Sequence, residues 1–218
     1  MVSEPVPPAG PSGRPDHDAA QAMYRWRAGH YDLQLAPYEG IRQEAVARLG
    51  LSPGQVVLDI GCGTGLSLSM LQQAVGPTGR VLGVDQCPEM VSEARHRVER
   101  HRWTRVELCC SPIETAPLPA GADAALFHFT HDILQSPGAL DHVLAHLKPG
   151  ARVVATGLKW TSPLYGPLNA LVWWNAMQSV TTLKGMEAPR QPLLDRGVSL
   201  QLEDRVLGTI YLASGQLH

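Results

Sequence analysis

The sequence predicts a doubly wound α/β fold, in which helices cover both faces of a seven-stranded, mostly parallel sheet. Three observations support this prediction. Strand-like segments alternate with helical ones from Pro53 onward, closely spaced glycines follow the first strand, and the last two strands, at 198–202 and 208–213, leave no room for a helix between them. Parallel neighbours require a crossover connection, so these last two strands are expected to pair antiparallel.

The chain starts with a segment, residues 1–18, that we expect to be a disordered tail, because it is rich in proline and has no apolar run. With no apolar run there is no sign of a secretory signal, which indicates a cytoplasmic protein. Residues 19–218 are expected to form one domain. Its first part, residues 19–50, combines helical stretches with breaks and carries several aromatic residues: Tyr24, Trp26, Tyr31 and Tyr38.

The next five strands are bounded by clear helix signals. Pro88 opens one of the helices between them, and Ser136 with Pro137 gives another helix an N-cap and a first-turn proline. The segment 148–150, Lys-Pro-Gly, is expected to stop that helix before the fifth strand. The strands are expected at about 55–60, 80–85, 105–110, 122–128 and 151–157.

The glycine-rich turn after the first strand is the most informative feature. Asp59 lies near the end of that strand, and Gly61, Gly63 and Gly65 follow it. Without β-carbons, such a turn lets a ligand lie against the backbone at the carboxyl end of the strand. A dinucleotide site would require glycine at Leu66, and the carboxylate would repel a pyrophosphate, whereas it suits an ammonium group.

Asp85 ends the second strand, about twenty residues beyond the glycines. A carboxylate at this place accepts hydrogen bonds from two vicinal hydroxyls of a ribose. Dinucleotide-binding folds use the same device, so Asp85 indicates a nucleoside ligand without fixing its type.

These residues resemble the first motif of the class I S-adenosylmethionine-dependent methyltransferases, a hydrophobic strand followed by Asp-x-Gly-x-Gly-x-Gly, here Asp59 to Gly65. Leu-Lys-Pro-Gly at 147–150 also resembles this family, and the similarity covers about residues 20–215. The resemblance implies a Rossmann-like fold with an antiparallel last strand. It also implies an enzyme with S-adenosylmethionine as its cofactor and S-adenosylhomocysteine as its product.

The resemblance assigns further cofactor contacts around the turn. Cys62 belongs to the turn that holds the cofactor, and Gln86 and Met90 are expected beside the adenosine. Met90 also shares a helical face with Val91 and Ala94, so a place in the core is an open alternative.

Two other segments are expected to contact the cofactor. After the third strand the chain departs from the family pattern, because Pro112 has no amide hydrogen to donate to the adenine; Ile113 is expected to pack on the ring instead. In the family, an N-terminal segment with a Tyr-Asp pair like Tyr31-Asp32 often folds over the cofactor as a lid that excludes water, which is the role implied for residues 19–50. Alternatively, its aromatic residues only dock the segment on the sheet.

The fourth strand leads into candidate catalytic residues. By resemblance, the backbone carbonyl of His128 meets the methionine end of the cofactor, and His131 and Asp132 lie nearer the acceptor. In-line methyl transfer needs alignment, and a base only when the acceptor is a hydroxyl. His131, oriented by Asp132, is the candidate base, and His128 is the second candidate catalytic residue. A histidine after a buried strand also commonly caps or packs, so that role stays open for His131.

An uncharged segment from Trp160 to Leu183 lies within residues 160–195, where relatives build a lid over the substrate. Prolines and glycines interrupt it, so we expect no stable membrane insertion. Its tryptophans and leucines predict a small, hydrophobic or aromatic acceptor. A buried packing helix, a homodimer face and an interfacial helix are the alternatives.

Composition excludes other classes of function. The 18 basic and 20 acidic residues give a net charge of −2, so we expect no nucleic-acid partner. The four cysteines show no metal-ligand spacing, and no metal is expected. Together with the resemblance, these observations lead us to expect a methyltransferase for O, N or C atoms of a small molecule, either monomeric or homodimeric. The alternatives are a non-catalytic S-adenosylmethionine-binding protein and a nicotinamide-dependent oxidoreductase.

Overall fold

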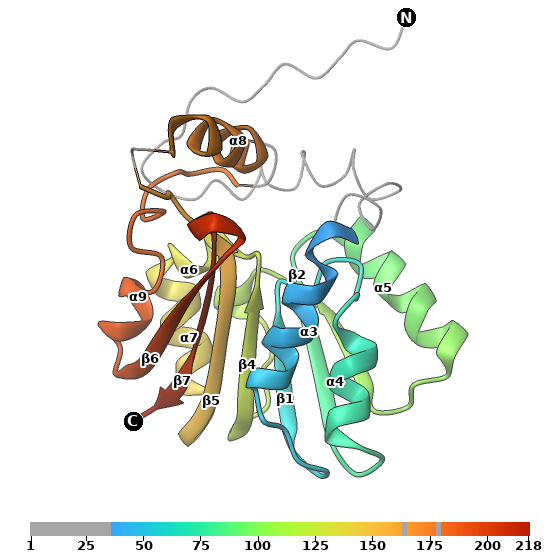
Figure 1. The fold of residues 1–218 in the computed structure, drawn as a ribbon. Coiled ribbons are helices and arrows are strands. Elements are labelled where there is room, and N and C mark those ends of the chain that lie inside the picture. Colours follow the sequence, from blue (N-terminus) through green and yellow to red (C-terminus); the bar gives the residue numbers. More distant parts are fainter. Residues whose placement is uncertain (1–35, 163–164, 178–179) are drawn as a thin grey trace, which may run out of the picture.

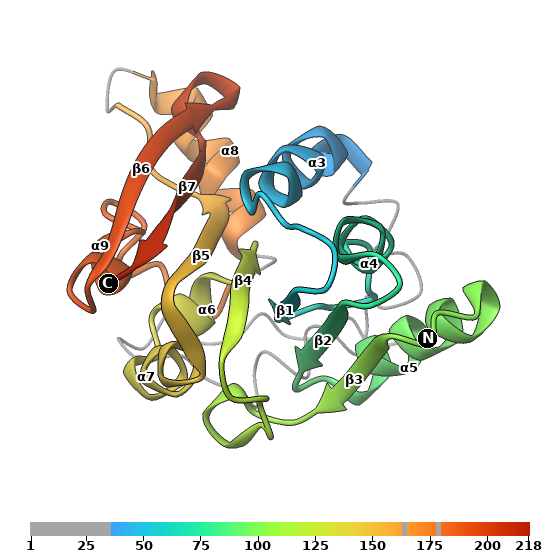
Figure 2. The same cartoon turned by 90° about the horizontal axis from the view of Figure 1, so that it is seen from below.

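The computed structural model describes residues 36–162, 165–177 and 180–218. These residues form a sheet with the strand order β3-β2-β1-β4-β5-β7-β6 (Figure 1; β3 is labelled in Figure 2). The expected fold class is confirmed, with strands β1 (Val56–Ile60), β2 (Arg80–Asp85), β3 (Val106–Cys110), β4 (Ala122–His128), β5 (Leu147–Leu158), β6 (Val198–Arg205) and β7 (Ile210–Leu217).

The strands β1 to β5 are parallel neighbours, and β7 runs antiparallel between β5 and β6. The short turn η4 (Val206–Gly208) joins β6 to β7 and is too short for the crossover that a parallel pair requires. The expected antiparallel pairing is confirmed. The strand order reverses between β1 and β4, so a ligand is expected beyond the carboxyl ends of these strands.

The start of β5 differs from the expectation. Helix α7 (Pro137–Ala145) ends before the Lys-Pro-Gly segment, and β5 already begins at Leu147, which pairs with Ala122. The register between β4 and β5 shifts between Ala122 and Ala124. Such an irregularity leaves room for Pro149, which has no N–H to contribute to a regular ladder.

Helices cover both faces of the sheet, as Figure 2 shows. One face carries α3 (Glu39–Arg48), α4 (Leu68–Val75) and α5 (Pro88–His101), and the other carries α6 (His131–Leu134), α7 and α9 (Gln191–Leu194). Helix α8 (Gly166–Met177) lies beyond the carboxyl edge of the parallel strands (Figure 1).

The expected helix signals are visible in α7. The Ser136 side chain accepts a hydrogen bond of 3.3 Å from the Ala139 backbone N–H, and Pro137 occupies the first turn. Leu140 and Val143 are fully buried on one face of the helix. Burial of each of these side chains stabilises the fold by about 1.5–3 kcal/mol.

Polar side chains interrupt the apolar face that α3 covers. Along β1, Leu58 and Ile60 belong to the core on the α7 side, whereas Val57 faces α3 and α4. Since side chains alternate along a strand, Asp59 shares the face of Val57. By the same alternation, His128 of β4 and Thr156 of β5 lie on this face too. Three neighbouring strands therefore place polar groups together at their carboxyl ends.

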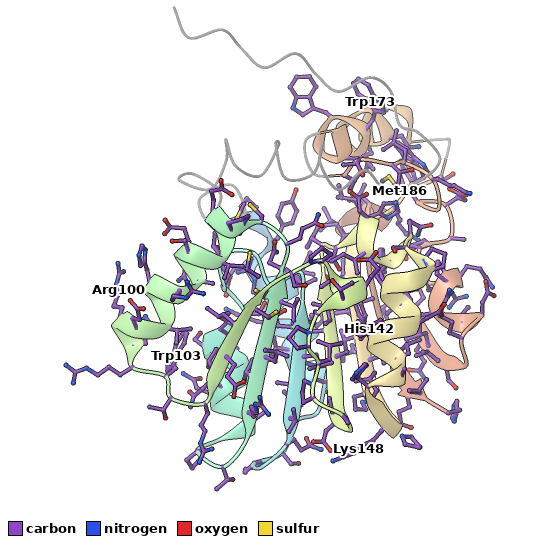
Figure 3. All side chains as sticks on the ribbon, turned by 180° about the vertical axis from the view of Figure 1, so that it is seen from behind. Arg100, Trp103, His142, Lys148, Trp173 and Met186 are labelled. Atoms are coloured by element: carbon purple, nitrogen blue, oxygen red, sulfur yellow. The ribbon has the colours of Figure 1, made fainter. Side chains whose placement is uncertain are left out.

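The insertion between β5 and β6 has a small core of its own, formed by Val172, Ala176 and Met186. Figure 3 shows Met186 between α8 and the sheet, whereas Trp173 lies on the outer side of α8. Trp173 and Trp174 are 47% and 61% exposed. Helix α8 thus has a packed side and an exposed aromatic side. No helix in the described ranges is both long and apolar enough to cross a membrane.

Candidate functional site

The glycine turn adopts backbone conformations that favour glycine. Gly61, Gly63 and Gly65 have φ angles of 71°, 55° and 81°, all in the left-handed region. A Cβ atom on Gly61 would lie 2.4 Å from Cγ2 of Thr130, and one on Gly65 would lie 2.6 Å from Cδ1 of Leu68. At these two positions, the chain's own side chains already require glycine, in addition to any ligand.

Backbone hydrogen bonds fix the turn to the neighbouring strand. The amides of Gly61 and Cys62 donate to the Val84 carbonyl at 2.8 and 3.0 Å. The Cys62 side chain packs against Gly83, where a Cβ would lie 3.0 Å from its sulfur. Burial raises the pKa of the Cys62 thiol well above its ordinary value, so this cysteine is a neutral packing residue. Its contact with the cofactor through the backbone stays a prediction.

Asp85 lies against the same turn. Its Oδ2 accepts a hydrogen bond of 2.9 Å from the Gly63 amide, and its Oδ1 accepts one of 2.9 Å from the Cys87 amide. Burial raises the pKa of Asp85, whereas these two amides oppose that effect. Each carboxylate oxygen has a second lone pair, so Asp85 can also accept from ligand hydroxyls.

Asp59 is the most buried acid of the site, with 2% exposure. Burial raises its pKa to about 7; the charge of Arg42 opposes this rise and the charge of Asp85 adds to it. Within the described residues, Oδ2 of Asp59 has no hydrogen-bond partner. A carboxylate in this state gains most from a ligand that brings a positive charge and N–H donors.

Besides the two acids, Arg42 of α3 is a charged residue that acts on the site, and it is only 2% exposed. It donates to the Glu39 carboxylate one turn earlier, and its charge lowers the pKa of both Asp59 and His128. We did not predict Arg42 from the sequence. The available signal was its helical spacing, which puts an arginine on the apolar face formed by Ala45, Val46 and Leu49.

His128 ends β4 with its ring fixed and uncharged. Its Nδ1 lies 2.7 Å from Oγ1 of Thr156, a fully buried residue of β5. Burial lowers the pKa of His128 to about 3, and Arg42 adds to this effect. The ring is therefore neutral at physiological pH and brings no positive charge to the site. The expected contact of its backbone with the cofactor stays a prediction, as does its candidate catalytic role.

Aromatic rings gather where β4 ends. Phe129 has a φ angle of 57°, which is uncommon for a residue other than glycine. Its ring centroid lies 5.1 Å from that of Tyr38 and 4.9 Å from that of His128. Its amide donates to the Thr156 carbonyl at 2.9 Å, which supports the strained conformation. Tyr38, His128 and Phe129 are called the aromatic cluster below.

His131 and Asp132 hold the insertion against α6. His131 Nε2 donates to the Lys184 carbonyl at 3.0 Å, because a carbonyl only accepts. Oδ2 of Asp132 accepts a hydrogen bond of 2.9 Å from the Thr181 amide and one of 2.8 Å from the Thr181 hydroxyl. Burial lowers the pKa of His131. These contacts match the packing role that the sequence left open, and the role of His131 as a base stays a prediction.

Comparisons with known proteins agree with this geometry. A family model described as a methyltransferase domain matches residues 57–150, which run from β1 into β5. This segment contains the glycine turn, Asp85 and the end of β4. Residues 57–150 are therefore similar to a methyltransferase domain, and the fold is that of solved S-adenosylmethionine-dependent methyltransferases.

Individual relatives of the methyltransferase domain are diverse. An arsenite methyltransferase of Halobacterium salinarum is 32% identical over 117 residues, which are 52% of this chain and 29% of the relative. A demethylmenaquinone methyltransferase of Lactococcus lactis is 29% identical over 173 residues, covering 74% of this chain and 68% of the relative. The solved structure of an S-adenosylmethionine-dependent methyltransferase from Aquifex aeolicus has a TM-score of 0.62 at 23% identity, covering 81% and 89% of the two chains. The chain spans about a third of the length of several curated relatives.

The remaining residues that were predicted to contact the cofactor differ in burial, and one of them, Tyr31, lies outside the described residues. Met90 and Ile113 are 1% and 4% exposed, and Ile113 belongs to the core on the α7 side. Their burial matches the packing alternative for Met90, and their contacts with adenosine stay predictions. Gln86 is half-buried just after β2. Tyr31 and the tail, residues 1–18, lie outside the described residues. In the described ranges, no group of side chains could hold a metal ion.

The described residues fit the cofactor of this family. S-adenosylmethionine carries an ammonium group, a carboxylate, a ribose and a sulfonium. Asp59 offers a buried carboxylate oxygen that accepts no hydrogen bond from the described residues, Asp85 offers lone pairs beside the turn, and His128 is neutral. Two acids against the one positive charge of Arg42, with a neutral histidine, suit a ligand with a net positive charge.

Proposed function

We propose that this chain binds S-adenosylmethionine and transfers its methyl group to a small apolar or aromatic acceptor. The observation that carries the proposal is the buried carboxylate of Asp59 just before the glycine turn, with Asp85 hydrogen-bonded to the Gly63 amide of that turn. Burying an ionised carboxylate in apolar surroundings costs several kcal/mol of desolvation free energy unless a cation pairs with it. A ligand with an ammonium group supplies that cation.

The proposed roles follow from the positions of the residues. Asp59 binds the ammonium group, Asp85 accepts from the ribose hydroxyls, and Gly63 lets the ligand lie against the turn. Gln86, Met90 and Ile113 lie beside the adenosine in this proposal. When bound, the cofactor supplies a methyl group made electrophilic by the sulfonium. The protein's part in transfer is alignment and exclusion of water.

The acceptor side of the site supports an apolar substrate. The aromatic cluster lies at the carboxyl end of β4, on the strand next to the glycine turn. The insertion at 160–195 adds an apolar core around Val172 and contributes no charge from Trp160 to Leu183. Such surfaces gain binding energy from matching apolar groups. The relatives named for a quinone and for arsenite leave the acceptor atom open.

We further propose that residues 19–50 and 160–195 close over the bound ligands. Tyr38, at the start of the described chain, already touches Phe129 at the carboxyl edge of the sheet. His131 is the proposed base where the acceptor is a hydroxyl. Its Nε2 carries the proton donated to Lys184, so Nδ1 is the nitrogen able to accept one.

Incubation with methyl-labelled S-adenosylmethionine and a panel of apolar phenols, quinones and amines tests the proposed transfer. The expected result is a labelled product from at least one apolar acceptor, read by mass spectrometry, and little labelling of charged acceptors of equal size. The Gly63→Val variant, whose side chain fills the cofactor's space, is the matched control. Preferred labelling of charged acceptors would contradict the apolar assignment. Cofactor binding without any product would favour a non-catalytic binding protein.

A further inference from the structure

Within residues 36–162, 165–177 and 180–218, the exposed large hydrophobic side chains gather at one end of the molecule. They are Tyr165, Trp173, Trp174, Val206 and Leu207. The first three lie just before α8 or within it, and the last two belong to the turn η4 between β6 and β7. This turn lies next to α8, at the carboxyl edge of the parallel strands (Figure 1, Figure 2). These residues are called the apolar patch below.

Hydrogen bonds hold the two parts of the apolar patch against each other. The Thr161 hydroxyl donates to the Leu207 carbonyl at 3.1 Å, a contact that spans 46 positions of the sequence. The Thr161 amide donates to Oδ1 of Asn169 at 3.0 Å. Asn169 lies on α8 one turn before Trp173, so the helix and the turn are linked through Thr161. The apolar patch is therefore one connected surface built from two distant segments.

The turn between β6 and β7 exposes its side chains with a strained backbone. Val206 and Leu207 have φ angles of 49° and 56°, a region that β-branched and bulky residues rarely adopt. Their exposed fractions are 60% and 73%. Turns that need positive φ angles normally use Asn, Asp or Gly. Two strained and exposed hydrophobic residues contribute little burial to the folded chain, so their place in this turn points to a partner outside it.

The polar side chains between these hydrophobic residues make their hydrogen bonds within the protein. Nδ2 of Asn169 donates to the Thr161 and Ser162 carbonyls at 3.2 and 3.3 Å, and the Thr161 hydroxyl donates to Leu207. An interface with another protein normally carries about one hydrogen bond per 100–200 Å². Because the donors of Asn169 and Thr161 are already used, the apolar patch suits a partner that is held by burial of apolar groups.

The charges that border the turn are paired with each other. Asp204 pairs with Lys159 at 2.6 Å, and Glu203 pairs with Arg205 at 2.8 Å. The stretch at 160–183, which includes α8, contains no charged residue. A neutral surface of this kind complements the interface of a lipid bilayer, where Trp and Tyr are enriched because their rings are apolar and carry one polar group.

We propose that the apolar patch docks the protein on the surface of a lipid bilayer. The side chains of Val206 and Leu207 enter the apolar layer, and the exposed tryptophans of α8 lie at the level of the headgroups. The apolar patch lies at the carboxyl edge of the parallel strands, where the glycine turn lies too (Figure 1). An apolar acceptor dissolved in the bilayer then reaches the site from the docked face, a consequence that rests on the proposed function.

Sedimentation with phosphatidylcholine vesicles tests the docking. We expect the full chain, without cofactor or acceptor, to sediment with the vesicles. In the double variant Val206→Asn with Leu207→Gly, the affinity for the vesicles falls about 10- to 100-fold, because two apolar side chains are lost from the interface. The midpoint of thermal unfolding of the double variant equals or exceeds that of the wild-type protein, because Asn and Gly adopt positive φ angles with less strain. A role of the two side chains in folding would lower this midpoint.

Arg102→Asn is the matched control. Arg102 also has a positive φ angle, 54°, but it follows α5 at the opposite edge of the sheet, and it is exposed. We expect this variant to bind phosphatidylcholine vesicles as tightly as the wild-type protein. Trp174→Gln changes the α8 side of the apolar patch and weakens vesicle binding about tenfold or more. If the double variant does not fold, Trp174→Gln carries the test.

The inference is overturned if the wild-type protein does not sediment with the vesicles, or if the double variant binds them equally well. A double variant that loses both binding and thermal stability also overturns it, because the two side chains then serve the fold. Analytical ultracentrifugation without lipid tests a second copy of the chain as the partner. Self-association that the double variant loses, without vesicle binding, would assign the apolar patch to a homodimer. A failure of the proposed function leaves these results unchanged, because neither cofactor nor acceptor is present.

Discussion

At the scale of single residues, the buried carboxylate of Asp59 lowers the stability of the free protein and is proposed to bind the ammonium group of the ligand. Its carboxylate is buried, its pKa is raised to about 7, and its charge is countered by Arg42. An acid with a raised pKa in the folded state binds its proton more tightly there than in the unfolded chain. The free energy of unfolding of the free protein therefore falls as the pH rises from about 4 to about 7.

The Asp59→Asn variant separates these two effects. We expect it to raise the midpoint of thermal unfolding of the free protein by a few degrees at pH 8, because the neutral amide has a lower desolvation cost. It weakens S-adenosylmethionine binding by about 10- to 100-fold, since it removes the partner of the ammonium group. Calorimetric unfolding and titration of the same samples measure both. A variant that loses stability and keeps its affinity would contradict the assignment of Asp59.

The pH dependence of binding provides a second test of Asp59. Below a pH of about 7 the carboxylate carries a proton and must release it to bind a cation. We expect the affinity for S-adenosylmethionine to rise between pH 5.5 and 7, by up to about tenfold per pH unit. In Asp59→Asn this slope is absent. An equal slope in the variant would assign the titration to another group.

Gly61 shows that a glycine of this turn serves the fold as well as the ligand. We expect Gly61→Ala to destabilise the protein by about 2 kcal/mol or more, because its Cβ would overlap Cγ2 of Thr130 and its φ angle is positive. The second substitution Thr130→Ser removes that methyl group and restores part of the stability. Urea unfolding of the single and double variants measures the recovery. A double variant with no recovery would show that backbone strain alone sets the cost.

At the scale of elements, α6 is a clamp for the insertion. Two of its four residues, His131 and Asp132, bond to Lys184 and Thr181, and these contacts span 53 and 49 positions of the sequence. The clamp connects the end of β4, where the cofactor is proposed to lie, with the segment that follows α8. The insertion, the proposed acceptor side of the site, is thus fixed to a short helix.

Removing the clamp is expected to loosen the insertion without changing the cofactor site. In Asp132→Ala, we expect amide hydrogen exchange around Thr181 to accelerate and the protein to lose about 1–3 kcal/mol, because buried donors lose their acceptor. Affinity for S-adenosylmethionine stays within about twofold. Asp141→Ala, which removes an exposed ion pair with Arg196, is the control and costs less than about 1 kcal/mol. Loss of cofactor affinity in Asp132→Ala alone would contradict a separate clamp.

At the scale of the whole molecule, local patterns predict the fold well. Alternating segments, Ser136 at an N-cap and the short connection at Val206–Gly208 are local signals, and each leads to the observed element. The start of β5 was placed too late, because Pro149 and Gly150 are typical of a turn. A shift of register with β4 accommodates them, and that shift depends on pairing with a distant strand.

The site was predicted only in part, because some of its residues follow a local pattern and others depend on contacts between distant segments. The motif of Asp59, the glycines and Asp85 is contiguous or lies at a fixed distance, so the sequence shows it. The buried Arg42 and the positive φ of Phe129 depend on packing between distant elements. The contact of His131 with Lys184 likewise depends on how the insertion folds back on α6. Such positions are visible only once the chain is folded.

The most direct test of the account is isothermal titration of the full chain with S-adenosylmethionine, S-adenosylhomocysteine and the nicotinamide dinucleotides. Gly63→Val, whose side chain fills the space beside the turn, is measured in parallel. The account predicts micromolar binding of the two sulfur nucleosides, loss of that binding in Gly63→Val, and no binding of the dinucleotides. Binding of a dinucleotide in place of S-adenosylmethionine would contradict it.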